Sequence, residues 1–115
     1  MATVRDVIAD AYDAFNARDI DRALRAMHPD VEWANGMDGG YVHGHQAVRE
    51  YWTRQWTQID PYGEPQRFTD DDAGRAVVDV HQVVRDLAGR VVSDQMVQHI
   101  YEIRDGLVTR MEIRK

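Results

Sequence analysis

The stretch "HPDVEWANGMDGGYVHGHQAVREYW", residues 28–52, places a helix end, a short strand and a helix start next to one another. Pro29 predicts the end of the preceding helix, because a residue that precedes proline is pushed out of the α region. Residues 31–35, "VEWAN", alternate in the way that a half-buried strand does. A glycine-rich loop follows, and Gly44, between two histidines, opens the next helix. We interpret the stretch as the rim of a pocket.

Two amphipathic helices are predicted before this stretch. Residues 3–17 carry apolar side chains at helical spacing, and we expect Thr3 to be the N-cap, with Asp6 three residues further on. Asp19 is expected to cap a second helix over residues 20–27.

The remainder of the chain predicts one more helix, over residues 46–58, and then strands separated by turn sequences. The predicted strands cover residues 65–69, 75–85, 91–103 and 107–114. Helices followed by a meander of strands indicate the α+β class, with the helices packed on one face of an antiparallel sheet.

The length of 115 residues predicts one domain, residues 1–115, around a single core. No apolar run reaches the roughly 20 residues that a membrane span needs, and the first residues show no secretory signal. We therefore expect a cytoplasmic protein with no membrane contact. The net charge of −6 argues against nucleic acid as a partner.

Several kinds of chemistry are excluded or disfavoured by composition. The chain has no cysteine, which excludes disulfides, thiolate metal sites and cysteine nucleophiles. His43 and His45 flank Gly44 without an obvious third ligand, so we interpret them as rim or helix-capping residues and expect no metal site. No phosphate-binding glycine loop or dinucleotide fingerprint is present, and we expect no cofactor.

The chain resembles the nuclear transport factor 2-like superfamily, which includes the ketosteroid isomerases and the SnoaL-like polyketide cyclases. The similarity covers essentially the whole chain and depends on "AYDAFNARDIDRALRAMHPDVEW" (11–33), "VHGHQAVREYW" (42–52) and "HIYEIRDGLVTRMEI" (99–113). The resemblance implies a cone-shaped, cystatin-like fold, in which three N-terminal helices pack on a curved antiparallel sheet around an internal cavity. It also implies a homodimer, commonly built from the sheet face.

Asn35 has two interpretations. As a strand-end residue, its amide would satisfy the backbone of the following loop. As a cavity residue on the same face as Val31 and Trp33, it would hydrogen-bond a ligand. By resemblance, Asn35 occupies the position of the catalytic aspartate base of ketosteroid isomerases. An amide cannot accept a proton at neutral pH, so that isomerisation mechanism should not carry over.

The long hairpin supplies the candidate acid–base residues. If the "DLAG" turn opposes His81 to Gln95, then Asp79 and His81 share a face with His99. The same face would hold Val77, Val83, Val97 and Tyr101. The other face would be the more apolar one and a candidate dimer interface, with Ala76, Val78, Val80, Val84, Val92, Met96 and Ile100.

His99, Asp79 and His81 are therefore the catalytic candidates, because a histidine titrates near operating pH. By resemblance, His99 falls near the oxyanion-binding acid of ketosteroid isomerases. A structural ion pair for Asp79 and His81, or a buried cross-sheet bond for His99, are the competing interpretations. The expected ligand-binding residues combine core-facing aromatics with polar groups: Tyr12, Phe15, Trp33, Asn35, Trp52, Trp56, Val97 and Tyr101.

Two functions remain open from sequence. The first is a SnoaL-like protein whose cavity binds a small, largely apolar organic ligand. If it is an enzyme, we expect cofactor-independent isomerase, cyclase or lyase chemistry, with His99 or the Asp79–His81 pair as acid or base. Asn35 and Tyr12 would then orient a carbonyl oxygen. The second is a non-catalytic ligand-binding or dimerisation module whose interior is filled by its own aromatic side chains.

Overall fold

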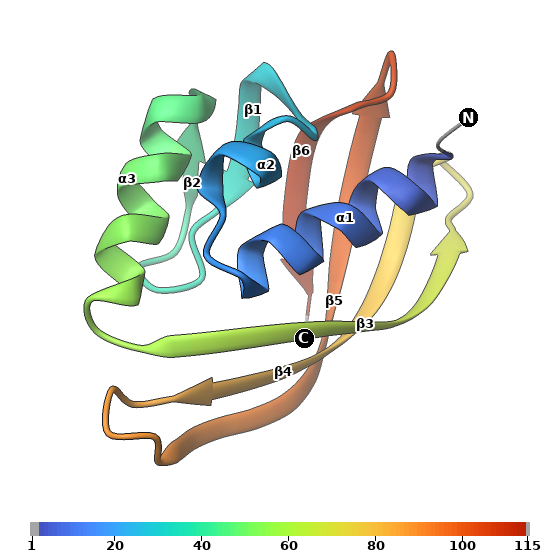
Figure 1. Cartoon of the computed structure of the whole chain (residues 1–115). Helices are drawn as coiled ribbons and strands as arrows, with labels where there is room; N and C mark the ends of the chain where they lie inside the picture. Colours follow the sequence, from blue (N-terminus) through green and yellow to red (C-terminus); the bar gives the residue numbers. More distant parts are fainter. Residues whose placement is uncertain (1–2, 115) are drawn as a thin grey trace.

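The computed structural model describes residues 3–114 and confirms the α+β class. Within that part of the chain, helices α1 (Val4–Asn16), α2 (Ile20–Leu24) and α3 (Gly44–Trp56) lie on one face of a six-stranded sheet (Figure 1). The strands follow the order β2-β1-β6-β5-β4-β3; β1 runs parallel to β6, and the other neighbouring pairs are antiparallel. Their bounds are β1 Met27–Ala34, β2 Tyr41–His43, β3 Asp60–Asp70, β4 Ala76–Arg85, β5 Val91–Arg104 and β6 Leu107–Arg114.

The predicted N-caps of the first two helices are confirmed. The Thr3 hydroxyl accepts a hydrogen bond from the Asp6 N–H at 3.2 Å, and the Asp6 carboxylate accepts one from the Thr3 N–H at 3.0 Å. This reciprocal pair is a capping box. The Asp19 carboxylate accepts from the Arg22 N–H at 3.2 Å. These caps fix where α1 and α2 begin, and therefore which side chains α1 turns toward the sheet.

The second helix is shorter than the predicted range 20–27, because the chain enters the sheet at Met27. Met27 pairs with Val108 in the parallel ladder between β1 and β6, and the Val108 N–H donates to the Ala26 carbonyl at 2.8 Å. The helix therefore ends before Pro29 is reached, and the strand predicted from residue 31 starts earlier.

The third helix begins at Gly44 rather than Gln46 and ends at Trp56 rather than Gln58. Gly44 has a φ of +86°, a backbone conformation that side chains with a Cβ disfavour. The sequence analysis missed β2, which is short and pairs with the end of β1.

Each hairpin of the β3–β6 meander contains a register shift. The shifts lie between Pro65 and Arg67 in β3, near the turn end of β4–β5, and at Thr109 of β6, opposite Glu102 and Ile103. A bulge bends its strand and increases the local twist. Three shifts along the meander therefore help to curl the sheet around the helices, as the long strands in Figure 1 show.

The bulge in the β4–β5 hairpin lies at Val92. Arg85 pairs with Val91 beside the turn, whereas Val84 pairs with Ser93. Val92 is therefore the extra residue of β5, and the pairing beyond it is displaced by one position.

The predicted opposition of His81 to Gln95 is wrong for this reason. His81 opposes Met96, and Gln82 opposes Gln95. Because side chains alternate strictly, the slip reverses every side chain of β4 relative to β5. The residues that share a face with Gln95, Val97, His99 and Tyr101 are Ala76, Val78, Val80, Gln82 and Val84.

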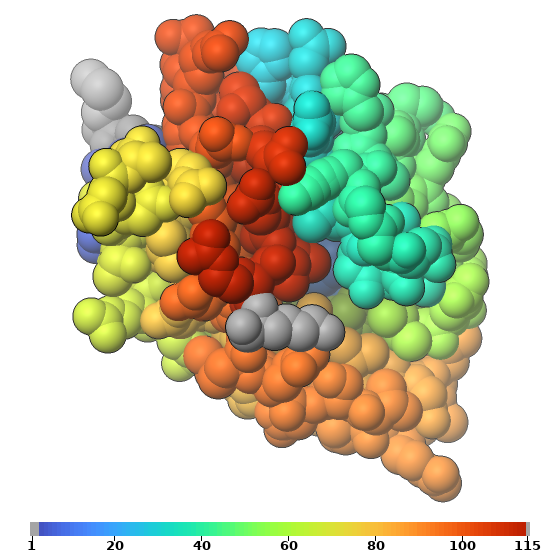
Figure 2. Space-filling model, turned by 180° about the vertical axis from the view of Figure 1, so that it is seen from behind, coloured from blue at the N-terminus to red at the C-terminus, as the bar shows by residue number. Residues whose placement is uncertain are grey.

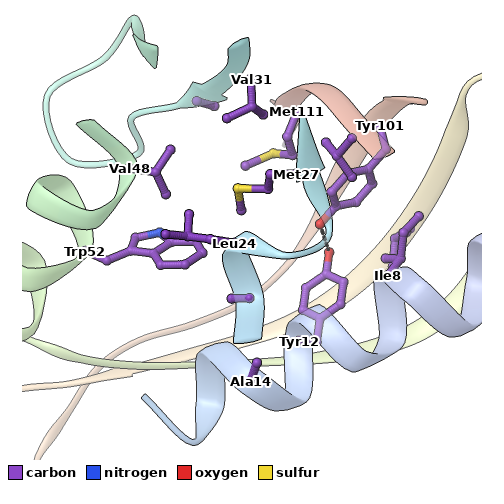
Figure 3. Close-up of a cluster of buried hydrophobic side chains, with 14 of the residues drawn as sticks. Ile8, Tyr12, Ala14, Leu24, Met27, Val31, Val48, Trp52, Tyr101 and Met111 are labelled. Carbon is purple, nitrogen blue, oxygen red and sulfur yellow. Dashed lines mark hydrogen bonds between the residues drawn. The ribbon is translucent and has the colours of Figure 1, made fainter. Parts of the chain in front are cut away.

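The main core lies between the helices and the concave face of the sheet. Figure 3 shows Tyr12 from α1, Trp52 from α3 and Tyr101 from β5 pointing into the same interior, with Met27 and Met111 between them. The other buried members of this cluster are Ile8, Ala14, Ala23, Leu24, Val31, Ala34, Val48, Tyr51, Ala76, Val78, Val80, Val97 and Val108.

The opposite face of the sheet, seen from behind in Figure 2, carries a network of charged side chains. Arg110 contacts Glu32 at 2.7 Å and Glu112 at 3.0 Å. Ile100, also on this face, is 1% exposed. The prediction of one apolar face that holds both Val78 and Ile100 is wrong. The bulge in the β4–β5 hairpin places these two side chains on opposite faces of the sheet. Among residues 3–114, no helix is long and apolar enough to cross a membrane.

Candidate functional site

A cavity of about 580 Å³ lies between the sheet and helices α1 and α3. Its wall includes exposed residues of the loop after β1 and of the start of β2, among them Gly39, Gly40 and Tyr41, where it meets the surface. The volume falls in the range of small-molecule sites, roughly 300–1,000 Å³. The stretch 28–52 supplies part of this rim.

Aromatic side chains form much of the cavity wall. Phe15 contacts Trp52 edge-on with ring centroids 5.2 Å apart, and Trp33 contacts Trp52 edge-on at 5.6 Å. Trp33 also packs against Tyr101 at 6.2 Å. These contacts join α1, α3, β1 and β5, so the wall is fixed by elements that are distant in the sequence.

Three side chains form a hydrogen-bonded chain at the cavity. The Tyr101 hydroxyl donates to the Tyr12 oxygen at 2.8 Å, the bond drawn in Figure 3. The Tyr12 oxygen lies 2.7 Å from His99 Nδ1, and the two rings stack with their planes 5° apart. His99 and Tyr101 are two residues apart on one strand face, and α1 brings Tyr12 across them.

Burial keeps all three groups neutral at pH 7. Desolvation lowers the pKa of His99 to about 4. Desolvation also raises the pKa of Tyr12 and of Tyr101 well above the ordinary phenol value. The site therefore works with hydrogen bonds between neutral groups rather than with charges.

The role of His99 at the cavity depends on its tautomer. The contact between the Tyr12 hydroxyl and Nδ1 of His99 is compatible with two tautomers of the neutral imidazole. In the tautomer in which Nδ1 accepts from Tyr12, the single N–H of the imidazole lies on Nε2. His99 lines the cavity, and in this tautomer it can offer Nε2–H to a hydrogen-bond acceptor there.

Asn35 lines the cavity and also braces the loop after β1. Its Oδ1 accepts hydrogen bonds from the Met37 N–H at 3.0 Å and from the Asp38 N–H at 2.9 Å. Asn35 thus satisfies the backbone of the loop and also lies at the cavity, while its hydrogen bond to a ligand stays a prediction. Its carbonyl is engaged in the loop, and only its NH₂ group is left for a ligand.

Asp79 and His81 lie on the outer face of the sheet. His81 Nε2 is 2.7 Å from Asp94 Oδ1, and Asp79 Oδ1 accepts a hydrogen bond from Gln98 Nε2 at 2.9 Å. The prediction that these two residues face the cavity with His99 is wrong, because the bulge at Val92 turns them outward. They do not form a pair with each other.

The predicted ligand-binding residues divide into two sets. Tyr12, Phe15, Trp33, Asn35, Trp52 and Tyr101 line the cavity. Trp56 and Val97 lie outside the lining; Trp56 packs behind it, with its ring 4.9 Å from the Arg18 guanidinium.

Polar lining residues that the prediction did not include as ligand contacts are, among others, Tyr51, Gln55, Gln82 and Gln95. The Tyr51 hydroxyl accepts a hydrogen bond from the Gly36 N–H at 3.0 Å. Gln82 and Gln95 oppose each other across β4 and β5, and the correct register would have revealed the pair.

The two histidines beside Gly44 do not come together on a ligand. His45 Nε2 contacts the Met27 carbonyl at 2.9 Å, and His43 is the N-cap of α3 without a side-chain cap bond. Within residues 3–114, no group of three acidic or histidine side chains is placed to hold a metal ion.

Helices packed on a curved sheet, with a cavity between them, are the architecture of a known family. The chain belongs to the SnoaL-like domain family, whose model matches residues 8–111. The suspected superfamily and the cystatin-like fold are therefore confirmed. No curated protein matches the sequence.

Solved structures show the same fold. TerC, co-crystallised with polyporic acid, is 32% identical with a TM-score of 0.84, over 96% of this chain and 88% of that chain. An NTF2-like protein of unknown function from Burkholderia pseudomallei is 27% identical with a TM-score of 0.85, over 99% and 91%. A protein from Sinorhizobium meliloti, provisionally named a polyketide cyclase, is 22% identical with a TM-score of 0.80, over 98% and 100%.

Proposed function

We propose that this protein binds a small, largely apolar organic ligand in its cavity, through a carbonyl-type oxygen that accepts a hydrogen bond from His99. The observation that carries the proposal is the Tyr101–Tyr12–His99 chain, which occupies Nδ1. We assign to His99 the tautomer in which Nδ1 accepts from Tyr12 and Nε2–H is the donor toward the ligand. A ligand carbonyl is the natural acceptor for such a donor in an apolar site.

The cavity wall supports a flat ligand. Phe15, Trp33 and Trp52 present ring surfaces from three different elements. Aromatic walls favour planar, unsaturated molecules, because ring contacts add to the burial of apolar area. The open volume also argues against the second hypothesis in its simplest form, an interior filled by its own aromatic side chains.

If the protein is an enzyme, the arrangement supports chemistry in which negative charge develops on the bound oxygen. The neutral donor at His99 would stabilise an enolate-like oxygen, as in cofactor-independent isomerisation, cyclisation or elimination next to a carbonyl. The proton base is the missing part, since Asn35 cannot accept a proton and His99 is a weak base at its lowered pKa. The alternative is a non-catalytic binding protein of the same fold.

The polyporic acid bound to TerC, and the provisional polyketide cyclase name of a neighbour, suggest unsaturated oxygenated compounds as probes. The test is a thermal-shift and calorimetric screen of polyporic acid together with aromatic ketones. A ligand that binds only the native state stabilises it by RT ln(1 + [L]/Kd), so the melting temperature rises with the logarithm of its concentration.

His99→Gln tests the role of the donor. Loss of one neutral hydrogen bond should weaken binding about 5- to 10-fold. His81→Gln is the matched control, because His81 lies on the outer face and its loss should leave affinity unchanged. Equal affinity of wild type and His99→Gln for every ligand found would rule out His99 as the anchoring group.

We also propose that two copies associate through the outer face of the sheet, as the family resemblance implies. The support is a group of side chains on β3, β4 and β5, here named the outer patch: Tyr62, Val83 and Met96. Tyr62 is 51% exposed and Met96 is 54% exposed. The His81–Asp94 pair lies among them and would supply polar contacts.

A further inference from the structure

The cavity is free of charged side chains throughout the described part of the chain. None of the residues 3–114 that line it is an aspartate, glutamate, lysine or arginine. Its polar lining consists of neutral amides, tyrosine hydroxyls and His99. A chain with a net charge of −6 and 30% charged residues thus surrounds its cavity with uncharged groups.

Two arginines near the cavity rim already have carboxylate partners. Arg54 donates to Asp38 at 2.7 Å, and Arg18 is paired with Asp60. Both pairs sit beside the rim on the loop after β1 and at the start of β3, outside the cavity lining. Neither arginine is available as a counter-charge for a ligand without losing its own ion pair.

We infer that the cavity selects its ligand by net charge, accepting uncharged molecules and admitting an acidic molecule only in its protonated form. This inference rests on the proposed function and adds the charge state of the substrate class. The physical reason is desolvation, because a carboxylate or enolate that enters the cavity loses its hydration and meets no opposite charge.

The surroundings of His99 explain why this residue does not supply the proton that an acidic ligand needs in order to bind. The titratable groups that face His99 are Tyr12 from α1 and Tyr101 from its own strand. The neighbouring strands place the apolar Val78 and Ile113 opposite His99.

Protonation of Nδ1 would turn Tyr12 from the donor to the acceptor of its hydrogen bond with that nitrogen. Nε2 already carries its hydrogen. The proton that accompanies an acidic ligand therefore comes from solvent and stays on the ligand oxygen. No covalent bond of the protein changes in this step.

The test compares two probes with the same ring system, 2-acetonaphthone and 2-naphthoate, by isothermal titration calorimetry. The ketone is expected to bind at neutral pH, and the carboxylate to bind at least about 100-fold more weakly. As the pH falls from about 7.5 to 5.5, the affinity for naphthoate should rise about tenfold per pH unit, with one proton taken up per molecule bound. Titration in buffers of different ionisation enthalpy counts that proton.

Gln82→Arg provides the converse test, because it places a cation in the lining. The variant should bind naphthoate more tightly than wild type and acetonaphthone no more tightly, whereas His81→Arg on the outer face should change neither affinity. Equal binding of both probes by wild type, without proton uptake, would overturn charge selection while leaving ligand binding intact. Binding of neither probe would overturn the proposed function, and this inference with it.

Discussion

At the residue scale, the centre of the site depends on side chains that no continuous motif joins. Alternation along residues 91–103 places His99 and Tyr101 on one face, and helical spacing turns Tyr12 inward; both could be predicted from sequence. Their hydrogen bonds could not, because Tyr12 and His99 are 87 residues apart and meet only through the way α1 crosses β5. Local periodicity predicts on which face of a helix or strand a residue lies, but not which distant residue it contacts.

Tyr12→Phe should destabilise the protein by about 1–3 kcal/mol. The change leaves His99 Nδ1 without its donor and Tyr101 without its acceptor, and unpaired buried polar groups carry a penalty of that size. Urea unfolding followed by circular dichroism measures the free energy of unfolding. Tyr62→Phe is the matched control, because that side chain is 51% exposed and should change stability little. Equal effects of both substitutions would contradict the role of the hydroxyl.

His99 should make stability fall as the solution becomes more acidic. Its pKa is lowered from 6.5 to about 4 in the native state, so the unfolded chain binds a proton that the native protein does not. The contribution is fully present above about pH 6.5 and is lost as the pH falls to about 4, and it amounts to ~3 kcal/mol.

The measurement is the free energy of unfolding between these pH values. Carboxylates also titrate there, but they are the same in every variant, so the difference between variants reports His99. His99→Gln should show a smaller loss over the interval than wild type does. Identical slopes for wild type and His99→Gln would show that His99 titrates alike in both states.

Asn35→Asp should keep the fold while placing a carboxylate in the cavity lining. A carboxylate oxygen can accept the same two backbone hydrogen bonds, from Met37 and Asp38, so we expect a change in stability within about 0.5 kcal/mol. Asn35→Leu removes the acceptor and should cost about 1–3 kcal/mol. Chemical denaturation of both variants shows whether the Asn35 side chain stabilises the loop after β1 or is dispensable for stability.

At the element scale, the order of helices and strands could be predicted except for β2, whereas the faces of β4 could not. The turn sequences "DDAGR" (71–75) and "DLAGR" (86–90) predict the hairpins correctly, and in both the first aspartate accepts hydrogen bonds from two backbone N–H groups of its loop. The bulge at Val92 has no such signature. Because of this one extra residue in β5, Gln82 lies in the cavity wall, where the prediction had placed His81.

Gly44→Ala should destabilise the start of α3 by about 1–2 kcal/mol, through the positive φ alone. A Cβ at this position would meet only the Pro29 carbonyl oxygen at an ordinary 3.5 Å, so no steric clash adds to the cost. Gly44→Asn should recover part of the loss, because asparagine tolerates the left-handed region better than alanine. Thermal unfolding of the three proteins measures the order glycine, asparagine, alanine, and the reverse order of the two variants would contradict a backbone origin.

At the scale of the whole molecule, the sheet divides the protein into two environments. The concave face carries the core and the uncharged cavity, while the convex face carries ion pairs such as Arg110–Glu32 and, toward the β4–β5 turn, the outer patch. The resemblance predicted the cone and the cavity, because both follow from the order of elements. Which face is apolar depends on the bulges, and it was assigned incorrectly for that reason.

The outer patch leads to a prediction about assembly. Tyr62 and Met96 expose apolar area on the convex face, beside the His81–Asp94 pair, and a second copy of the same patch would cover them. We expect sedimentation of the wild-type protein to show a dimer. Met96→Glu should shift it toward monomer, because the new carboxylate would be buried opposite a copy of itself.

The cavity lies on the other side of the sheet, so ligand affinity measured on the monomeric variant should stay close to that of wild type. Val4→Glu is the control for surface charge, since Val4 is exposed on α1, away from the patch. A wild-type protein that sediments as a monomer over a range of concentrations would contradict the dimer. Loss of ligand binding together with dimerisation would instead show that the two faces of the sheet are coupled, because disruption of the convex face alone would then disturb the cavity.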